Sequence, residues 1–420
     1  PRVAAAIAGV DPARLRALVD RLAASHTRHS LSDPAPGGGG IGGAAAWIES
    51  ELRAYAAASG GRLRVERDEF VAPPGKRIPA PTRLVNVLAT LPGTAAGAAA
   101  ARVYVVGAHY DTRCSDPMNA TCAAPGADDD GSGTAAVMEL ARVLSAHSFD
   151  ATIVFALFAG EEQGLLGSAH LAERARAEHW DLAGMMTLDI VGRSGGTRPP
   201  RVRVFSEGVP PAAPPDEMKR LAEIGAEADS PARQLARFVH AVVPLHVPAL
   251  ATMPVWRIDR YLRGGDHKPF AERGFAALRW TEPVEDYALQ HQDVRVEGGV
   301  AYGDTPEHVE ADYLALVTRG VGATLAALAL APPAPPGATM DTAKLDADTV
   351  LRWRAPPDAD VAGYEVLMRP TTAPFWESAL WVGAVNGVTV HATKDDFIFA
   401  VRAVDAEGHR GPASFPLPVK

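Results

Sequence analysis

Three short apolar runs, separated by segments with a helical spacing of apolar residues, constrain the fold of this chain more than any other feature. The runs cover residues 102–108, 152–158 and 185–190, and the helical segments cover residues 133–145 and 165–178. Apolar and β-branched runs of this length are typical of buried strands, and their alternation with helices favours a mostly parallel sheet with helices on both faces. We therefore predict an α/β fold built on a mostly parallel, mixed sheet.

Segments before and after this core also have the patterns of helices or strands. Helical spacing predicts helices over residues 11–25, 44–59 and 308–330. Strand patterns cover residues 62–70, 82–91 and 275–280. The Pro-rich region 192–254 shows no clear periodicity, so we expect an irregular insertion that covers a functional site as a lid.

A Pro-rich stretch at residues 332–338 divides the chain, and such a sequence is typical of a stiff linker. We expect residues 1–331 to form the large α/β domain. Residues 339–420 have apolar side chains at period two, which is typical of a small antiparallel β-sandwich. These alternating side chains are Leu351 and Trp353, Tyr364 and Val366, and Phe397, Phe399 and Val401.

The composition is that of a soluble globular chain, with 47% hydrophobic and 22% charged residues. The formal net charge of −9 argues against nucleic-acid binding, because phosphate recognition needs a basic surface. The longest near-continuous apolar stretch, residues 320–331, is shorter than the roughly 20 residues of a membrane span. We expect it to be the end of a buried helix, and we expect no membrane span.

The chain has only two cysteines, Cys114 and Cys122, in a stretch rich in Asp, Pro, Asn and Gly that is typical of a loop. Two free thiols in an exposed loop would be a liability, whereas a short loop can close a disulfide in an oxidising compartment. We predict a Cys114–Cys122 disulfide and an extracytoplasmic location, periplasmic or secreted. The sequence begins at Pro1, and we expect that a signal peptide preceded it.

Potential metal ligands follow the predicted strands at their carboxyl ends, where open α/β sheets gather their ligands. The first strand is followed by His109 and, two residues on, Asp111. The second is followed by Glu161 and Glu162, and the third carries Asp189 among apolar residues. A carboxylate inside an apolar strand is costly unless it is paired or bound to metal. The order of these residues predicts a metal site at the strand ends.

Three successive carboxylates, Asp128, Asp129 and Asp130, stand in a Gly-rich segment before a predicted helix. Either one of them caps the helix while the others are solvated, or a dication neutralises at least one of them. A ligand set of His, Asp and Glu without Cys suits hydrolytic zinc. In adjacent carboxylates such as Glu161 and Glu162, one can bind metal while the other takes a proton from the attacking water.

Taken in order, these residues resemble the motifs of the clan MH zinc peptidases of the secreted bacterial aminopeptidase type, relatives of glutamate carboxypeptidase and glutaminyl cyclase. The resemblance covers about residues 10–331. It rests on His109-Tyr110-Asp111, the run from Gly126 to Gly133, Glu161-Glu162-x-Gly164-x-x-Gly167-Ser168, Asp189 and His291.

This resemblance implies a zinc exopeptidase fold and a site with two Zn²⁺ ions. The ligands that it implies are His109, Asp129, Glu162, Asp189 and His291. By the same resemblance, Asp129 would bridge the two ions, Glu161 would be the general base, and Asp111 would orient His109.

The sequence departs from the family pattern beside the last ligand, His291. The family commonly has a Tyr directly before that His, contributing to oxyanion stabilisation, and here Gln290 stands there. Tyr287 is the candidate replacement for that Tyr, and His267 is the reserve candidate for the last ligand. The C-terminal region resembles a fibronectin type III sandwich, and we expect it to contact carbohydrate or protein, or to act as a spacer.

The expected activity is that of a di-zinc metallo-aminopeptidase acting on peptides. The alternatives are a carboxypeptidase or dipeptidase, a glutaminyl-cyclase-like acyl transferase, and a non-catalytic binding protein. An acidic group for a free amine, or an arginine clamp for a carboxylate, would discriminate between the exopeptidases. The candidates for these roles are Glu207 and Glu282, and Arg193, Arg257, Arg260 and Arg263.

Overall fold

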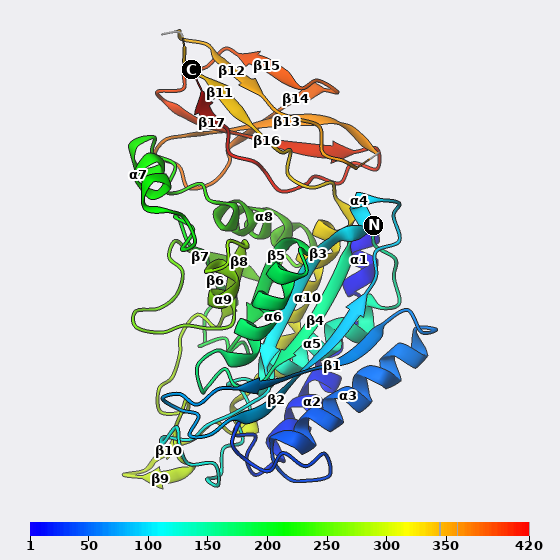
Figure 1. Ribbon diagram of the computed structural model, residues 1–420, viewed down its shortest axis with the longest axis vertical. Coiled ribbons are helices and arrows are strands. Elements are labelled where there is room, and N and C mark those ends of the chain that lie inside the picture. The colour runs from blue at the N-terminus through cyan, green and yellow to red at the C-terminus, as the bar shows by residue number, and fades with distance from the viewer. Residues whose placement is uncertain (344–345, 359, 420) are drawn as a thin grey trace.

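The computed structural model describes residues 1–343, 346–358 and 360–419 of the chain (Figure 1). An eight-stranded mixed sheet with helices on both faces forms the lower part of the molecule, and two small sheets form the upper, C-terminal part. This architecture confirms the predicted α/β fold class with an additional all-β region.

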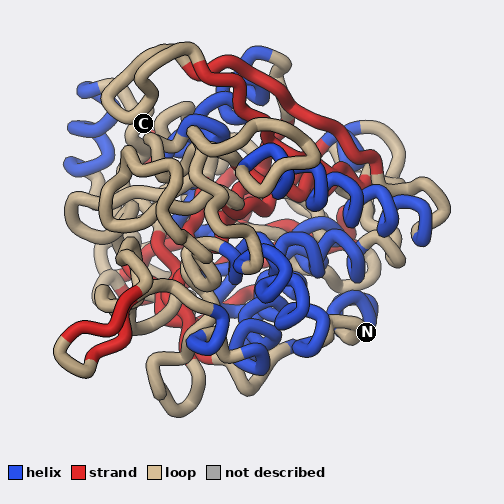
Figure 2. Tube along the Cα trace, turned by 90° about the horizontal axis from the view of Figure 1, so that it is seen from below, coloured by secondary structure: helices blue, strands red, loops and turns tan. Residues whose placement is uncertain are grey.

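The large sheet has the strand order β1-β2-β4-β3-β5-β8-β6-β7, in which the central strands β4, β3, β5 and β8 are parallel. Its strands are β1 (Arg64–Ala72), β2 (Thr82–Leu91), β3 (Arg102–His109), β4 (Thr152–Phe158), β5 (Asp181–Leu188), β6 (Arg201–Phe205), β7 (Ala251–Val255) and β8 (Ala277–Thr281). Because the central strands are parallel, their carboxyl ends meet at one edge of the sheet. Figure 2, seen from below, shows loops gathered over this end, with the hairpin of β9 (Arg295–Glu297) and β10 (Val300–Tyr302) projecting beside them.

The helices bury apolar side chains against both faces of this sheet. One face packs against α3, α5, α8 and α10, with α2 packed on α5 and α10, and the other face packs against α6 and α9. The helices are α1 (Arg2–Ile7), α2 (Pro12–Ala23), α3 (Ile41–Ala58), α4 (Ala98–Ala101), α5 (Gly131–Leu144), α6 (Leu166–Ala177), α7 (Pro215–Glu223), α8 (Pro231–His246), α9 (His267–Ala271) and α10 (Ala311–Leu330). Asp11 caps α2 by accepting the Ala13 N–H at 2.9 Å, as this residue type favours.

The expectation of an irregular lid over residues 192–254 is wrong. This region contributes strands β6 and β7 to the edge of the sheet, and it contributes the buried helix α8. Its prolines fit regular structure, because Pro215 and Pro231 occupy the first turns of α7 and α8 and Pro254 lies on the edge strand β7. Short edge strands and a helix that contains Pro244 leave little periodicity to detect in the sequence.

The apolar stretch at residues 320–331 ends helix α10, as expected, but the helix begins earlier than that stretch. With 20 residues, α10 is long and apolar enough to cross a membrane by length and composition. However, 83% of its most apolar window is buried inside the protein, where α10 packs against α1, α2, α5 and α8. The structure therefore accounts for its hydrophobicity as that of a core helix.

The C-terminal strands form a four-stranded sheet, β15-β12-β11-β17, and a three-stranded sheet, β14-β13-β16. The strands are β11 (Thr339–Asp341), β12 (Thr349–Arg352), β13 (Val361–Pro370), β14 (Ser378–Gly383), β15 (Gly387–Val390), β16 (Phe397–Asp405) and β17 (Leu417–Val419). The apolar residues that alternate in the sequence form the core between them, including buried Leu351, Trp353 and Val401. The division of the chain at residues 332–338 and the fibronectin type III assignment stay predictions, and Lys420 lies outside the described residues.

The C-terminal region contacts the α/β region through a buried ion-pair network. The Asp229 carboxylate accepts hydrogen bonds from Arg237 of α8 at 2.9 Å and from Arg369 of β13 at 2.7 Å. Nearby, the Phe375 ring lies 5.9 Å from the ring of Trp256, which follows β7. Both contacts join residues that are far apart in the sequence.

Replacing Asp229 by alanine should lower the free energy of unfolding by about 3–5 kcal/mol. The replacement leaves two buried arginines without their shared carboxylate, and an uncompensated buried charge costs about this much. Urea unfolding of the variant measures the loss. The exposed Asp216, changed to alanine, is the matched control and should shift stability by no more than about 0.5 kcal/mol. A loss in Asp229→Ala as small as that of the control would contradict this account of the interface.

Candidate active site

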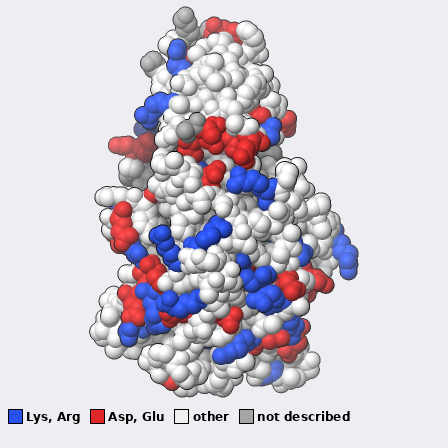
Figure 3. Space-filling view, turned by 90° about the vertical axis from the view of Figure 1, so that its right-hand side faces the viewer, with Lys and Arg blue, Asp and Glu red and all other residues white. Residues whose placement is uncertain are grey.

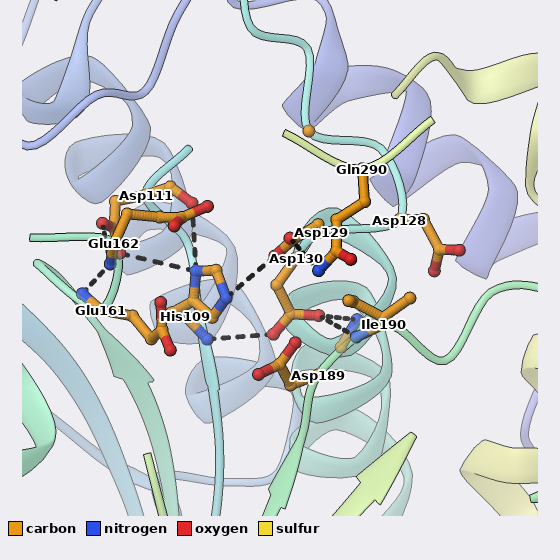
Figure 4. A network of polar contacts seen from close by, with 12 residues as sticks. His109, Asp111, Asp128, Asp129, Asp130, Glu161, Glu162, Asp189, Ile190 and Gln290 are labelled. Carbon is orange, nitrogen blue, oxygen red and sulfur yellow. Dashed lines mark hydrogen bonds and ion pairs between the residues drawn. The ribbon is translucent and has the colours of Figure 1, made fainter. Parts of the chain in front are cut away.

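The predicted site residues meet at the carboxyl ends of the parallel strands (Figure 4). His109 is the last residue of β3, and Asp189 directly follows β5. Glu161 and Glu162 lie in the turn between β4 and α6, and Asp129 lies in the loop before α5. Neighbouring parallel strands thus bring residues together that are up to 80 positions apart in the sequence.

Two clusters of three potential ligands share one carboxylate. His109, Asp129 and Asp189 offer atoms that all lie within 4.8 Å of one another, and so do Asp129, Glu162 and His291. One oxygen of Asp129 lies 3.2 Å from His109 Nε2, and its other oxygen lies 2.9 Å from His291 Nε2. This donor set of imidazoles and carboxylates fits zinc, and the position of Asp129 fits a carboxylate that bridges two ions.

Asp111 links the end of β3 to the turn that carries the two glutamates. Its carboxylate oxygen lies 3.6 Å from His109 Nδ1, the nitrogen that faces away from Asp129. The same carboxylate accepts the N–H groups of Glu161 at 3.1 Å and of Glu162 at 3.2 Å. A carboxylate behind a ligand imidazole fixes the orientation of its ring, so Asp111 is suited to hold His109 in place.

The three successive aspartates have three different surroundings. Asp130 caps α5 and also accepts the His109 N–H at 3.1 Å. Asp128 accepts the N–H of Gly192 at 2.7 Å. Helix capping therefore explains Asp130, whereas Asp129 alone of the three faces the two imidazoles.

The electrostatics of the cluster favour a cation at its centre. Burial by itself lowers the pKa of His291, but the charges of Glu162 and Asp129 outweigh it and raise this pKa to about 10. Burial raises the pKa of Glu161 well above its usual range, and the charges of Glu162 and Asp189 add to the effect against the opposing charge of His109. A carboxyl group with a raised pKa is suited to take and return a proton near neutral pH.

Two charged residues of this site were not predicted from the sequence. Arg279 of β8 is fully buried, and its Nη2 lies 3.1 Å from the Asp189 carboxylate. Asp304 accepts the backbone N–H groups of Asp128 at 2.9 Å and Asp129 at 2.7 Å. A charged residue inside the apolar strand β8 was the available signal for Arg279, whereas Asp304 lies in a loop that offered none.

Gln290, which replaces the usual Tyr, contacts the shared carboxylate. Its Nε2 donates a hydrogen bond to Asp129 Oδ2 at 3.1 Å, and its side chain lines the cavity beside the cluster. The candidate replacement, Tyr287, has a side chain that is 62% exposed and is not among the residues that line this cavity. Gln290 is therefore better placed than Tyr287 to meet a substrate.

His267, the reserve candidate for the last ligand, belongs to neither cluster in the described chain. It is buried, and its Nε2 lies 2.8 Å from the carbonyl oxygen of Ile258. Burial lowers the pKa of His267 to about 4. The structure brings His291 instead into the group with Asp129 and Glu162.

A cavity of about 950 Å³ opens onto the cluster. One wall is the segment of residues 257–264, which includes Arg257, Arg260 and Arg263. The acidic candidates Glu207 and Glu282 do not line this cavity, and burial raises their pKa values to about 8 and about 11. Of the candidate groups for binding a substrate amine or a substrate carboxylate, the cavity thus contains the arginines and neither of the two glutamates.

The predicted disulfide between Cys114 and Cys122 is present, and it closes a loop beside the cavity. Arg113, directly before this loop, lines the cavity. The Ser115 hydroxyl donates a hydrogen bond to Asp293 at 2.8 Å. The disulfide loop therefore contacts the segment that follows His291.

The sheet, the shared-carboxylate cluster at its strand ends and the adjoining cavity define a metal-dependent hydrolase of the α/β class. The chain belongs to peptidase family M28, whose profile matches residues 86–312. A relative from Leptosphaeria maculans named "Probable zinc metalloprotease" is 43% identical over 99% of this chain and 97% of its own length. The protein is therefore a zinc peptidase by family.

Solved structures with the same fold include two enzymes of different activity. The LapA aminopeptidase of Legionella pneumophila matches with a TM-score of 0.54 and 19% identity, over 77% of this chain and 74% of its own. A glutaminyl cyclase of Fimbriiglobus ruber matches with a TM-score of 0.54 and 20% identity, over 75% of this chain and 95% of its own. At this level of identity, the similarity shows the fold.

Proposed function

We propose that the protein is a di-zinc aminopeptidase that removes N-terminal residues from peptides. The observation that carries this proposal is the position of Asp129 between two ligand clusters, with a different imidazole facing each of its oxygens. In this proposal His109 and Asp189 hold one ion, and Glu162 and His291 hold the other. Zinc in these positions supplies a Lewis acid that polarises the scissile carbonyl and makes water a better nucleophile at neutral pH.

The residues of the chain perform the proton transfers and the positioning. The Glu161 carboxylate lies at the cavity and accepts a proton from the attacking water, then donates it to the leaving amine. Asp111 keeps the His109 ring in one orientation and also fixes the backbone of Glu161. Gln290, with its amide at the shared carboxylate, is the candidate donor towards the carbonyl oxygen in place of the usual Tyr.

A carboxypeptidase or dipeptidase is the second candidate function. The specific observation that favours it is the set of arginines in the cavity wall at residues 257–264, because arginine binds carboxylates.

We also propose an extracytoplasmic location, supported by the Cys114–Cys122 disulfide. A fibronectin type III-like role of residues 339–420, in contact with carbohydrate or protein, stays part of this proposal.

A substrate panel with and without a zinc chelator tests the proposed activity. Aminoacyl amides and unblocked peptides should be hydrolysed, the chelator should abolish hydrolysis, and added zinc should restore it. N-acetylated peptides should resist, because they lack the free amine. Cleavage of only the N-blocked peptides would overturn the aminopeptidase assignment in favour of a carboxypeptidase, and cyclisation of an N-terminal glutamine would indicate an acyl transferase.

A further inference from the structure

The cavity beside the metal cluster is rich in cationic side chains. Those that line it are Arg77, Arg113, Arg257, Arg260, Arg263 and Lys268. On the face shown in Figure 3, by contrast, both positive and negative side chains lie on the surface. A concentration of one sign inside a cavity attracts ligands of the opposite sign.

The five carboxylates that line the cavity leave most of these cations without an ion-pair partner. Four of them form the proposed zinc site and its base, and the fifth, Asp259, is buried. Asp259 already pairs with Arg260 at 3.1 Å and with Arg279 at 3.3 Å. Within the described chain, Arg263 and Lys268 form no ion pair, and the hydrogen bond of Arg257 goes to the Tyr261 hydroxyl at 2.8 Å.

The backbone between Arg263 and Lys268 passes close to a proposed zinc ligand. A Cβ added to Gly265 would lie 3.3 Å from an Asp189 carboxylate oxygen, so the backbone is pressed against the cluster at this point. A Cβ added to the preceding Gly264 would lie 3.6 Å from Lys268 Nζ. The Lys268 ammonium therefore lies beside this segment, and Lys268 lines the same cavity as the proposed zinc ligand Asp189.

We propose that this cavity binds a carboxylate of the substrate through Arg263 and Lys268, with Arg257 on the same wall. The inference rests on the proposed peptidase function and names its substrate class, which is peptides with a carboxylate close to the scissile bond. This carboxylate belongs either to an acidic side chain or to the α-carboxylate of a short peptide. Both sources offer the same chemistry to the cations, so the experiment has a separate arm for each.

Three pairs of substrates, each differing by one negative charge, test the proposal in the zinc-loaded full chain. Asp-Ala amide and Asn-Ala amide place the charge at the N-terminal residue, and Ala-Glu amide and Ala-Gln amide place it at the second. Ala-Leu and its amide differ only in the α-carboxylate. In at least one pair, kcat/KM should be at least about 10-fold higher for the carboxylate member, as expected for charge-assisted hydrogen bonds.

Variants then connect this preference with the named cations. In the double variant Arg263→Met, Lys268→Met, the kcat/KM of the charged and the uncharged substrate of the preferred pair should differ by no more than about 2-fold. The change should come mainly from a higher KM for the charged substrate, because its carboxylate contact is lost. Lys268→Arg keeps the charge and should keep the preference. Lys219→Met removes an exposed cation on α7, outside the cavity, and should leave the ratio as it is.

Ratios near one for all three pairs in the wild type, or a preference that survives in the double variant, would overturn the proposal. If no peptide is hydrolysed, the proposed function fails instead. Calorimetry still tests the carboxylate site in that case, because the Glu161→Gln variant loaded with zinc should bind the charged member of a pair at least about 10-fold more tightly. Equal affinities within each pair would overturn the carboxylate site independently of turnover.

Discussion

Replacing Glu161 by glutamine should lower kcat by about 10²–10⁴-fold, which is the usual contribution of a general base. Glutamine has nearly the same shape but cannot accept the proton of the attacking water. KM should change little, because the groups that hold the substrate are still present. Steady-state kinetics with the best unblocked substrate measures both parameters.

This variant should retain its zinc and its thermal stability, which separates loss of the base from loss of the site. The exposed Glu272, changed to glutamine, is the matched control for the chemistry of the substitution and should keep wild-type activity. Turnover of Glu161→Gln at the wild-type rate would show that another group takes the proton. In that case the proposed mechanism would be wrong even if the zinc site is correct.

Replacing Asp129 by alanine should remove both zinc ions, because its two oxygens serve both clusters. Changes behind a ligand already cost 10–100-fold in metal affinity, so loss of a shared ligand should weaken both sites by at least about 100-fold. Zinc content by mass spectrometry, after equilibration in a buffer of fixed free zinc, measures the number of ions per chain. Activity should fall together with the metal.

The variant His291→Ala provides the comparison, since it removes a ligand from only one cluster. It should lose one ion and keep the one held by His109 and Asp189. Asp216→Ala, on the exposed surface of α7, should keep the wild-type zinc content. Two ions retained in Asp129→Ala would contradict the role of Asp129 as a bridge.

Much of this site could be predicted from the sequence because its residues follow strands whose apolar runs are easily detected. His109 and Asp189 stand at the ends of β3 and β5, and Glu161 follows β4 at a short distance. Once these strands are taken as parallel, the sheet brings their ends together without further information. His291 follows no such strand, and only its resemblance to a family motif predicted it.

The other parts of the site and of the fold depend on contacts between distant residues, which no local sequence pattern encodes. Arg279 pairs with Asp189, which follows the neighbouring strand β5, and Asp304 approaches the Asp129 backbone from a distant loop. The region 192–254 gives no clear periodic signal, because its edge strands are short and its prolines lie at helix starts and at the sheet edge. The cationic wall at residues 257–264 could be named from the sequence as a set of candidates, but only the fold placed it in the cavity.

Anomalous X-ray scattering at the zinc absorption edge, from crystals of the zinc-loaded protein, tests the central claim most directly. The account predicts two peaks about 3.5–4 Å apart, the usual separation in two-metal sites. One peak should lie among His109, Asp129 and Asp189, and the other among Asp129, Glu162 and His291. A single peak, or peaks that do not share Asp129, would contradict a di-zinc centre in this peptidase.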